Sequence, residues 1–249
     1  MKIFYRSFTF LMVTFYFPFM ASAQQMQTDR PNETESPNAV TSHHLQVENG
    51  FSFERQQNEK TYEIPQVVMR YGIFKNTEIR VESVLKISDQ NQQHGFGITP
   101  VIVGFKYHIL DHKGVAIPDI GILGRVSIPW MADKVFKDKY YSPEIRLLAQ
   151  HTLSKTTHLG YNAGVHWLSR SADPEYIYSI SADHSLSQKL KLFVETFGTA
   201  VSQHHAQNSA DVGVLFLSNK NLQFDFMAGT GIMHGYNNKF AELGVSFRI

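Results

Sequence analysis

The chain has 249 residues, a net charge of +1 and no cysteine, and 43% of its residues are hydrophobic. The absence of cysteine excludes disulfide scaffolds, thiolate metal sites and cysteine nucleophiles. A net charge close to zero, without a basic stripe, argues against a nucleic-acid partner.

The first 23 residues have the three parts of a secretory signal peptide. Lys2 and Arg6 give a positive start, residues 8–20 form an apolar core, and Ala21-Ser22-Ala23 supplies the small residues of a cleavage site. The apolar core is too short to cross a bilayer as a helix. We therefore expect export with removal of residues 1–23; an uncleaved N-terminal anchor is the alternative.

The mature part of the chain contains no run of about 18 apolar residues, which a transmembrane helix needs. Since only helices and closed barrels span lipid, the mature chain is either soluble in the periplasm or a β-barrel. Residues 24–42 are polar and irregular and include Pro31 and Pro37. Their composition favours a disordered periplasmic leader.

From His43 onward, apolar and polar residues alternate with a period of two, the pattern of a strand with one apolar and one polar face. Twelve segments follow this pattern, at residues 43–54, 66–71, 79–87, 101–109, 119–126, 144–150, 159–167, 175–183, 191–195, 211–216, 222–229 and 240–249. Their apolar faces carry no Asp, Glu, Lys or Arg, as a lipid-facing surface requires.

The last of these segments shows the pattern most clearly. Leu243, Val245 and Phe247 are expected to contact lipid, and Glu242 and Arg248 to face a charged interior. To close a barrel, this strand must pair with the one that begins near His43. Connections near residues 75, 112, 155, 187 and 219 are mostly short, and those near 57, 92, 133, 172, 205 and 237 are generally longer or more polar, including a loop at 88–95 and the longest one at 129–141. This alternation predicts that both ends of the mature chain lie in the periplasm.

The predicted fold is therefore all-β: a transmembrane, antiparallel, up-and-down barrel of about 12 strands over residues 43–249. A soluble sandwich or a lipocalin-like barrel is the alternative, with its apolar face turned inward. Aromatic residues that fall near strand ends, such as Tyr107, Trp167 and Tyr176, favour the membrane barrel, because they resemble interfacial girdles.

Charged residues on the polar faces are expected to line the lumen. The candidates are Glu48, Arg70, Arg80, Glu82, Lys106, Arg125, Arg146, Asp225, Glu242 and Arg248. They form either the wall of a selective channel or pairs across a narrow interior, and they leave no obvious apolar path.

The leader carries charges of its own. Asp29, Arg30, Glu33 and Glu35 could reach charged partners in the lumen. Residues 28–37 are then either an ordered plug or gate, or a flexible tether.

Two short motifs in the leader resemble a known family. They are Thr28-Asp29-Arg30-Pro31 and Thr34-Glu35-Ser36-Pro37, followed by a strand with Gln46-Val47-Glu48-Asn49-Gly50. Over residues 28–249 the chain is similar to the outer-membrane transporters of the MetA-pathway of phenol degradation family. The resemblance implies an outer-membrane location and transport of small solutes, with aromatic or hydrophobic compounds suggested. It also implies recognition of the C-terminal strand by the barrel-insertion machinery, although many such barrels end in Phe and this one ends in Ile249.

Catalytic and metal sites have little support in the sequence. His184 and Ser185 are neighbours and so point to opposite faces of a strand, as do the histidines of the pairs 43–44 and 204–205. No zinc-protease or phosphate-loop motif is present. We expect no enzyme activity, no metal and no cofactor. A channel or transporter is the first hypothesis, a structural or adhesion barrel acting through its external loops is the second, and an outer-membrane hydrolase is the third.

Overall fold

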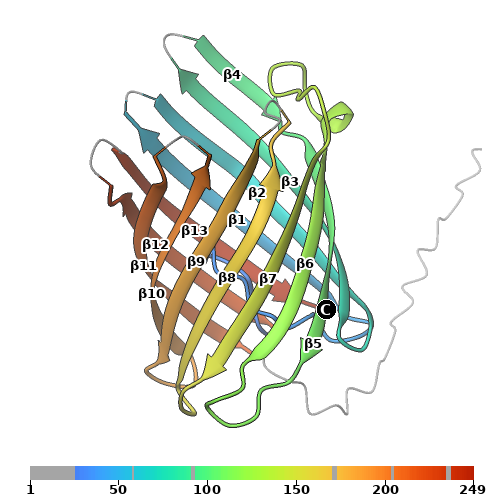
Figure 1. The fold of residues 1–249 in the computed structure, drawn as a ribbon, viewed down its shortest axis with the longest axis vertical. Helices are drawn as coiled ribbons and strands as arrows, with labels where there is room; N and C mark the ends of the chain where they lie inside the picture. The colour runs from blue at the N-terminus through green and yellow to red at the C-terminus, as the bar shows by residue number, and fades with distance from the viewer. Residues whose placement is uncertain (1–25, 58, 91–92, 170–172, 203–204, 234–236) are drawn as a thin grey trace, which may run out of the picture.

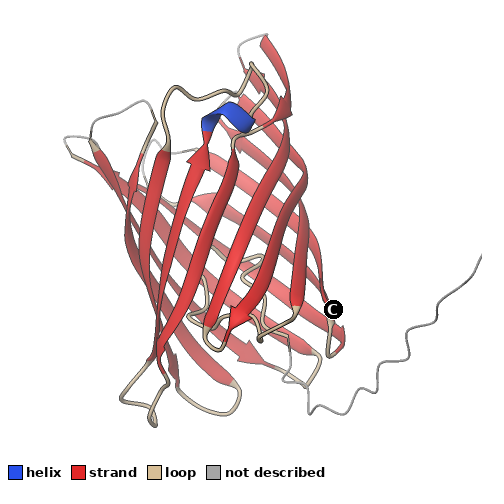
Figure 2. Cartoon of the chain, turned by 90° about the vertical axis from the view of Figure 1, so that its right-hand side faces the viewer, coloured by secondary structure: helices blue, strands red, loops and turns tan. Residues whose placement is uncertain are grey.

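The computed structural model describes residues 26–57, 59–90, 93–169, 173–202, 205–233 and 237–249, so the predicted signal peptide lies outside the described residues. The chain forms one antiparallel sheet that curls into a barrel (Figures 1 and 2). The strands are β1 (Leu45–Gln56), β2 (Glu59–Phe74), β3 (Thr77–Gln90), β4 (Gln93–Ile98), β5 (Val101–Leu110), β6 (Asp119–Ile128), β7 (Ser142–Thr152), β8 (Thr157–Trp167), β9 (Pro174–Ser185), β10 (Leu190–Val201), β11 (Gln207–Asn219), β12 (Leu222–Gly231) and β13 (Asn238–Arg248).

The ring closes where the sequence predicts. β13 pairs antiparallel with β1, from Gln46 opposite Arg248 to Gln56 opposite Asn238, and β2 pairs with both β1 and β3. β4 and β5 both pair with β3, β4 along Leu85–Gln90 and β5 along Thr77–Glu82, so they share one place in the ring. The described strands therefore make a closed barrel of twelve positions, which confirms the predicted fold class.

The interruption between β4 and β5 falls at Thr99 and Pro100. Proline has no N–H to donate to a strand ladder, which accounts for the break. The Thr99 N–H still donates to the Val84 carbonyl at 3.0 Å, so the chain stays on its path along β3.

The two faces of the barrel are the reverse of those of a soluble protein. Outward side chains are apolar and open: Val194 is 55% and Val212 58% exposed. Inward side chains are charged and covered: Lys106 is 0% and Arg70 1% exposed. The apolar face thus points out toward lipid, as in a transmembrane barrel, which rejects the soluble sandwich and the lipocalin-like alternatives.

One expectation about the connections was wrong. The stretch 88–95, expected to be a polar loop, is largely strand, because β3 runs to Gln90 and β4 begins at Gln93. The polar composition reflects a hairpin that rises above the rest of the barrel (Figure 1). The predicted contrast in loop length holds for most connections: those at 75–76, 153–156, 186–189 and 220–221 are short, and those at 129–141, 168–173, 202–206 and 232–237 are longer. The exceptions include the short connection at 57–58 and the long one at 111–118.

The longest connection does lie at 129–141, and it includes a short 3-10 helix, Pro129–Met131. Among the described residues, no helix is long and apolar enough to cross a membrane.

Candidate functional site

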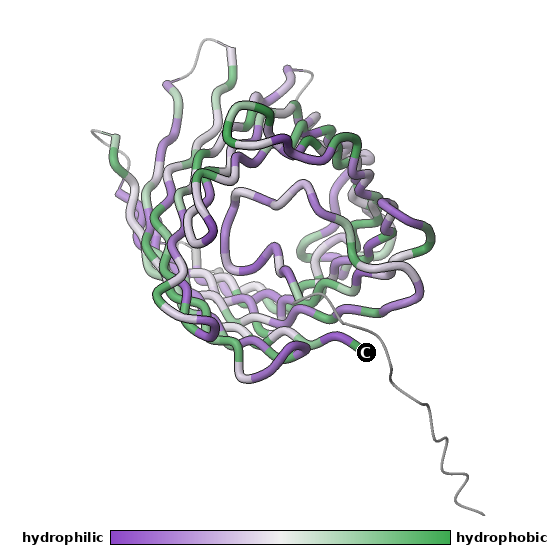
Figure 3. The backbone as a smooth tube through the Cα atoms, turned by 90° about the horizontal axis from the view of Figure 1, so that it is seen from below, coloured by the Kyte–Doolittle hydropathy of each residue, from purple (hydrophilic) through white to green (hydrophobic). Residues whose placement is uncertain are grey.

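Residues 26–42 lie inside the barrel, and we refer to this segment as the plug. Seen along the barrel, it forms a loop within the ring of strands (Figure 3). It enters and leaves at the same end: the Met26 N–H donates to the Lys220 carbonyl in the β11–β12 turn, and the His43 N–H donates to the Gly72 carbonyl near the end of β2. The chain therefore folds its own leader back into the lumen.

The plug has almost no secondary structure, so its backbone N–H groups need other partners. Carboxylates of the wall supply them. Glu195 accepts from the N–H of Glu33 at 2.8 Å and from that of Thr34 at 2.6 Å. Glu48 accepts from the N–H of Asp29 at 3.2 Å and of Arg30 at 3.1 Å.

Glu78 and Asn162 hold the plug in the same way further along. The Val40 N–H donates to Glu78 at 2.7 Å, and Asn162 pairs with the backbone of Glu35 in both directions, at 2.7 and 3.0 Å.

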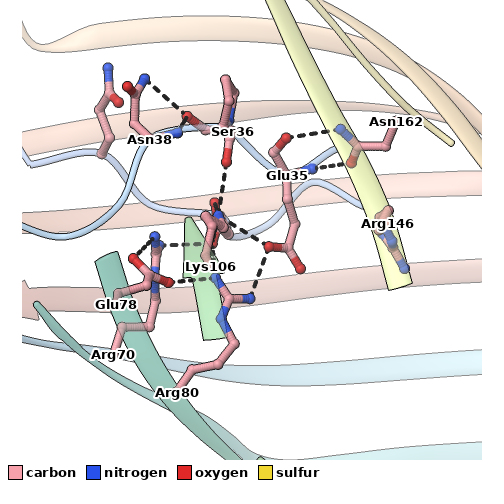
Figure 4. A network of polar contacts seen from close by, with 12 residues as sticks. Glu35, Ser36, Asn38, Arg70, Glu78, Arg80, Lys106, Arg146 and Asn162 are labelled. Carbon is pink, nitrogen blue, oxygen red and sulfur yellow. Dashed lines mark hydrogen bonds and ion pairs between the residues drawn. The ribbon is translucent and has the colours of Figure 1, made fainter. Parts of the chain in front are cut away.

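One side of the lumen is a cationic wall, which we define as Arg70, Arg80, Lys106, Arg125 and Arg146 on β2, β3, β5, β6 and β7. Two carboxylates of the plug meet it. The Asp29 carboxylate lies 2.7 Å from Arg80 Nη2, 2.7 Å from Lys106 Nζ and 2.9 Å from Arg70 Nη1. The Glu35 carboxylate lies 2.9 Å from Arg80 Nη1 and 3.2 Å from Lys106 Nζ (Figure 4).

Acids of the barrel complete this network. Glu78 pairs with Arg70 at 2.9 Å and with Arg80 at 2.7 Å, and Glu48 pairs with Arg70 at 2.7 Å. Buried charges are tolerated only when they are paired and hydrogen-bonded, and here Arg70, Arg80 and Lys106 each touch at least two acids.

The charge state of Glu35 follows from these contacts. Burial alone would raise the pKa of this carboxyl group, but the neighbouring charges of Arg80, Lys106 and Arg125 outweigh burial and hold the pKa well below its usual range. Glu35 is therefore ionised and keeps its ion pairs with the wall.

The opposite side of the lumen is an acidic wall, which we define as Glu195, Asp211, Asp225 and Glu242 on β10–β13. Arg30 of the plug extends toward it. Its Nη2 lies 3.1 Å from the Glu242 carboxylate and 3.5 Å from that of Asp225, and it also donates to the Leu243 carbonyl at 3.3 Å. Its Nη1 donates to the Gln66 side chain at 2.7 Å.

Glycines on the inner wall make room for the plug. Gly50 and Gly244 face each other across the β1–β13 pair, and a Cβ at either position would collide with the guanidinium of Arg30. A Cβ at Gly121 would lie 2.8 Å from the Pro37 carbonyl oxygen, and one at Gly72 would overlap the backbone of Thr41. Backbone and side chains of the plug thus sit directly against the barrel wall.

Small cavities remain on either side of the plug. One of about 290 Å³ lies toward the end with the short turns, between Asp29 and Lys191, and is lined in part by Phe193 and Leu215. Another of about 220 Å³ lies between the plug, Gln66 and Arg125. The plug therefore divides the interior into separate spaces.

The structure places every candidate lumen residue predicted from the sequence inside the barrel. Seven are buried and Glu82, Arg125 and Glu242 are partly exposed to the interior. Of the four predicted plug charges, three form ion pairs. The Glu33 side chain is exposed, and within the described part of the chain only its backbone is held, by Glu195 and by Arg146, which donates to its carbonyl at 3.1 Å.

Two groups of interior contacts were not predicted from the sequence. The first group comprises the contacts of Glu78 and Glu195 with the plug. Glu195 lies on the polar face of the predicted segment 191–195, whereas Glu78 precedes the predicted segment 79–87, and the backbone partners of both are brought close only by folding. The second group is an apolar patch, which we define as Phe193, Leu215, Met227 and Phe240. It corrects the expectation of no apolar path, and parity could have found it, since each residue lies on the polar face of its strand.

A serine, a histidine and a glutamate meet on the inner face near one rim. Ser142 Oγ lies 2.9 Å from His166 Nε2, and His166 Nδ1 lies 3.5 Å from the Glu175 carboxylate. Ser142 also donates its proton to the Trp167 carbonyl at 2.6 Å. Since a hydroxyl donates only one hydrogen bond, Nε2 must be the donor to Ser142 and is not free to act as a base. The arrangement is structural as it stands.

The fold and the lumen define a transmembrane β-barrel with a charged interior that is filled by its own N-terminal segment. By its match to the family model over residues 28–249, the chain belongs to the family described as MetA-pathway of phenol degradation. A search of curated proteins gives no match.

Solved structures share the fold at low identity. The COG4313 outer membrane channel from Pseudomonas putida F1 is 9% identical with a TM-score of 0.63, covering 86% of this chain and 98% of that one. The NanC porin is 10% identical with a TM-score of 0.55, covering 81% and 98%. The KdgM porin, in complex with disordered oligogalacturonate, is 9% identical with a TM-score of 0.55, covering 80% and 98%.

Proposed function

We propose that this protein is an outer-membrane channel for small solutes and that the plug closes its lumen. Export through the signal peptide at residues 1–23 and recognition of β13 by the barrel-insertion machinery belong to this proposal. The family and the fold support the location, and the interior contacts of the plug support the closure.

The observation that carries the proposal is the kind of contact that holds the plug. Hydrogen bonds and ion pairs to the wall predominate. Apart from an isolated bridge between Ser42 and Gly72, no strand pairing ties the plug to the sheet among the residues that the structure describes. Polar contacts of this kind can be exchanged for water, whereas strand pairing cannot be lost without opening the barrel. Movement of the plug would leave a continuous polar lumen behind it.

The apolar patch suggests the class of solute. Phe193, Leu215 and Met26 are among the residues that line a cavity of about 290 Å³. Aromatic rings pack well against apolar side chains of this kind. Together with the description of the family, this favours small aromatic compounds among the solutes. We propose transport without catalysis, because His166 is a donor to Ser142.

A liposome swelling assay with graded solutes tests the proposal. The chain has no cysteine, so Thr34→Cys with Ser179→Cys, whose hydroxyls are 2.8 Å apart, would pin the plug to β9 through one engineered disulfide. We expect solute flux with the wild type and with the reduced double variant, and greatly reduced flux after oxidation. Flux of no solute, at any size, with the wild type and with a chain lacking residues 28–37 would overturn the channel and support the structural or adhesion barrel.

A further inference from the structure

Two histidines and two aspartates gather where β5 ends and β6 begins. His108 on β5 and Asp119 at the start of β6 both point inward and are buried, while Asp111 and His112 lie in the connecting turn. One ligand atom each of His108, Asp111 and Asp119 fall within 4.8 Å of one another. His112 joins them through its Nδ1, 3.0 Å from Asp119 Oδ2.

The hydrogen bonds of His108 fix the direction of its lone pair. Its Nδ1 lies 3.3 Å from the Pro37 carbonyl oxygen, which only accepts, so Nδ1 carries a hydrogen. In the neutral ring, Nε2 is then an acceptor, yet it faces the Asp111 carboxylate at 3.0 Å. Two acceptors at this distance need a cation between them, either a proton or a metal ion.

These features match a transition-metal site. Imidazole nitrogen and carboxylate oxygen are ligands of Zn²⁺, and a metal-bound histidine usually donates its other N–H to a backbone carbonyl, as His108 does to Pro37. Ligands of a tetrahedral zinc ion lie roughly 3.4 Å apart at bond lengths of about 2.1 Å. Closing from the present spacing needs only a small shift, and the Asp111 side chain, which is 91% exposed, is free of packing that would oppose it.

We propose that His108, Asp111 and Asp119, together with His112, bind one divalent transition-metal ion, with Zn²⁺ as the best match. The two carboxylates, Asp111 and Asp119, balance the charge of the divalent ion. This balance is needed because two further positive charges, Lys75 and Arg248, line a cavity of about 330 Å³ beside His108 and Asp111. The sequence alone predicted no metal, because its adjacent histidine pairs suit joint ligation poorly and no zinc-protease motif is present. Folding brings His108 and Asp119 together although they are eleven positions apart.

The site touches the plug as well. His108 holds the Pro37 carbonyl through the ring nitrogen opposite the one that would bind the metal. A bound ion fixes the His108 ring and so strengthens this contact with the part of the plug that leads to β1.

Calorimetric titration of the untagged protein in detergent micelles with Zn²⁺ tests the site, with Co²⁺ absorption as a second readout of tetrahedral coordination. We expect one Zn²⁺ per chain, bound at least about tenfold more weakly by His112→Ala and by Asp119→Asn. His158→Ala is the matched control, because His158 Nδ1 lies 3.0 Å from Asp183 in a similar pair that has Lys191 beside it, and its affinity should equal that of the wild type.

His112 lies in an exposed turn, so His112→Ala keeps the test valid if Asp119→Asn does not fold. Absence of Zn²⁺ binding by the wild type would overturn the site, and so would equal affinity in the wild type and His112→Ala. Neither result depends on whether the barrel conducts solutes, so failure of the metal site and failure of the channel are distinguishable.

Discussion

The cationic wall and the acidic wall differ in what neutralises them. The cationic wall pairs both with acids of its own and neighbouring strands, such as Glu78, and with the plug acids Asp29 and Glu35. The acidic wall depends on the plug for much of its pairing: Arg30 reaches Asp225 and Glu242, and backbone N–H groups reach Glu195. The plug thus bridges two walls of opposite charge.

The order of charges in the plug explains how one segment serves both walls. Successive side chains of an extended chain point to opposite sides. Asp29 and Arg30 are neighbours of opposite sign, and they reach the cationic and the acidic wall respectively. The match between the plug and the two walls therefore depends on the order of Asp29 and Arg30 in the sequence as well as on their charges.

The largest expected effect is on the cationic wall. Arg80→Ala removes the cation shared by Asp29, Glu35 and Glu78, and loss of one partner of a buried pair costs about 3–5 kcal/mol. Guanidinium unfolding in detergent micelles should show this fall in unfolding free energy. The same substitution in a chain lacking residues 28–37 should cost less, since two of the four acids that pair with Arg80 are gone. Equal costs in the two chains would show that the plug acids do not contribute to the stability of the cationic wall.

A smaller effect is expected at Glu195 on the acidic wall. Glu195→Gln keeps the shape but weakens two charge-assisted hydrogen bonds to the plug backbone, for an expected loss of about 1.5–3 kcal/mol. Asp211→Asn is the contrast on the next strand, because neither carboxylate oxygen of Asp211 has a hydrogen-bond partner in the described part of the chain. Asp211→Asn should leave the unfolding free energy unchanged or raise it, and a loss equal to that of Glu195→Gln would contradict this account.

At Arg30, a substitution that keeps the positive charge tests the geometry of the guanidinium group. Arg30→Lys retains one positive charge but cannot reach Gln66 and Glu242 at once, because an ammonium lacks the guanidinium fork. We expect a loss of about 1 kcal/mol in the same unfolding experiment. An unchanged value would mean that only the charge of Arg30 matters.

The smallest effect is expected at Glu33, which lies in the same segment. Its carboxylate is exposed and forms no ion pair with the described residues, so Glu33→Gln should change the unfolding free energy by less than about 0.5 kcal/mol. A loss comparable to that of Glu195→Gln would show that the charge of the plug as a whole, rather than its specific pairs, provides the stability.

The sequence predicted the parts of this structure that follow from local periodicity. Parity along each strand placed Arg70, Arg80 and Lys106 inside, and the pairing of β13 with β1 followed from closure. The path of the plug could not be predicted, because an irregular segment has no period and its partners, such as Glu195 and Asn162, come from strands far along the chain. The apolar patch was not predicted for another reason. Its residues, such as Met227, lie on faces that also carry charged residues, and only the charged residues were taken as lumen candidates.

If the plug, held between the two walls, closes the lumen, a chain without it should conduct more ions than the wild type. Single-channel conductance in planar bilayers measures this difference between the wild type and a chain lacking residues 28–37. Removal of Asp29, Arg30 and Glu35 should join the cavities of about 290 and 220 Å³ into one open lumen, so the conductance should rise severalfold. An unchanged conductance would contradict the account.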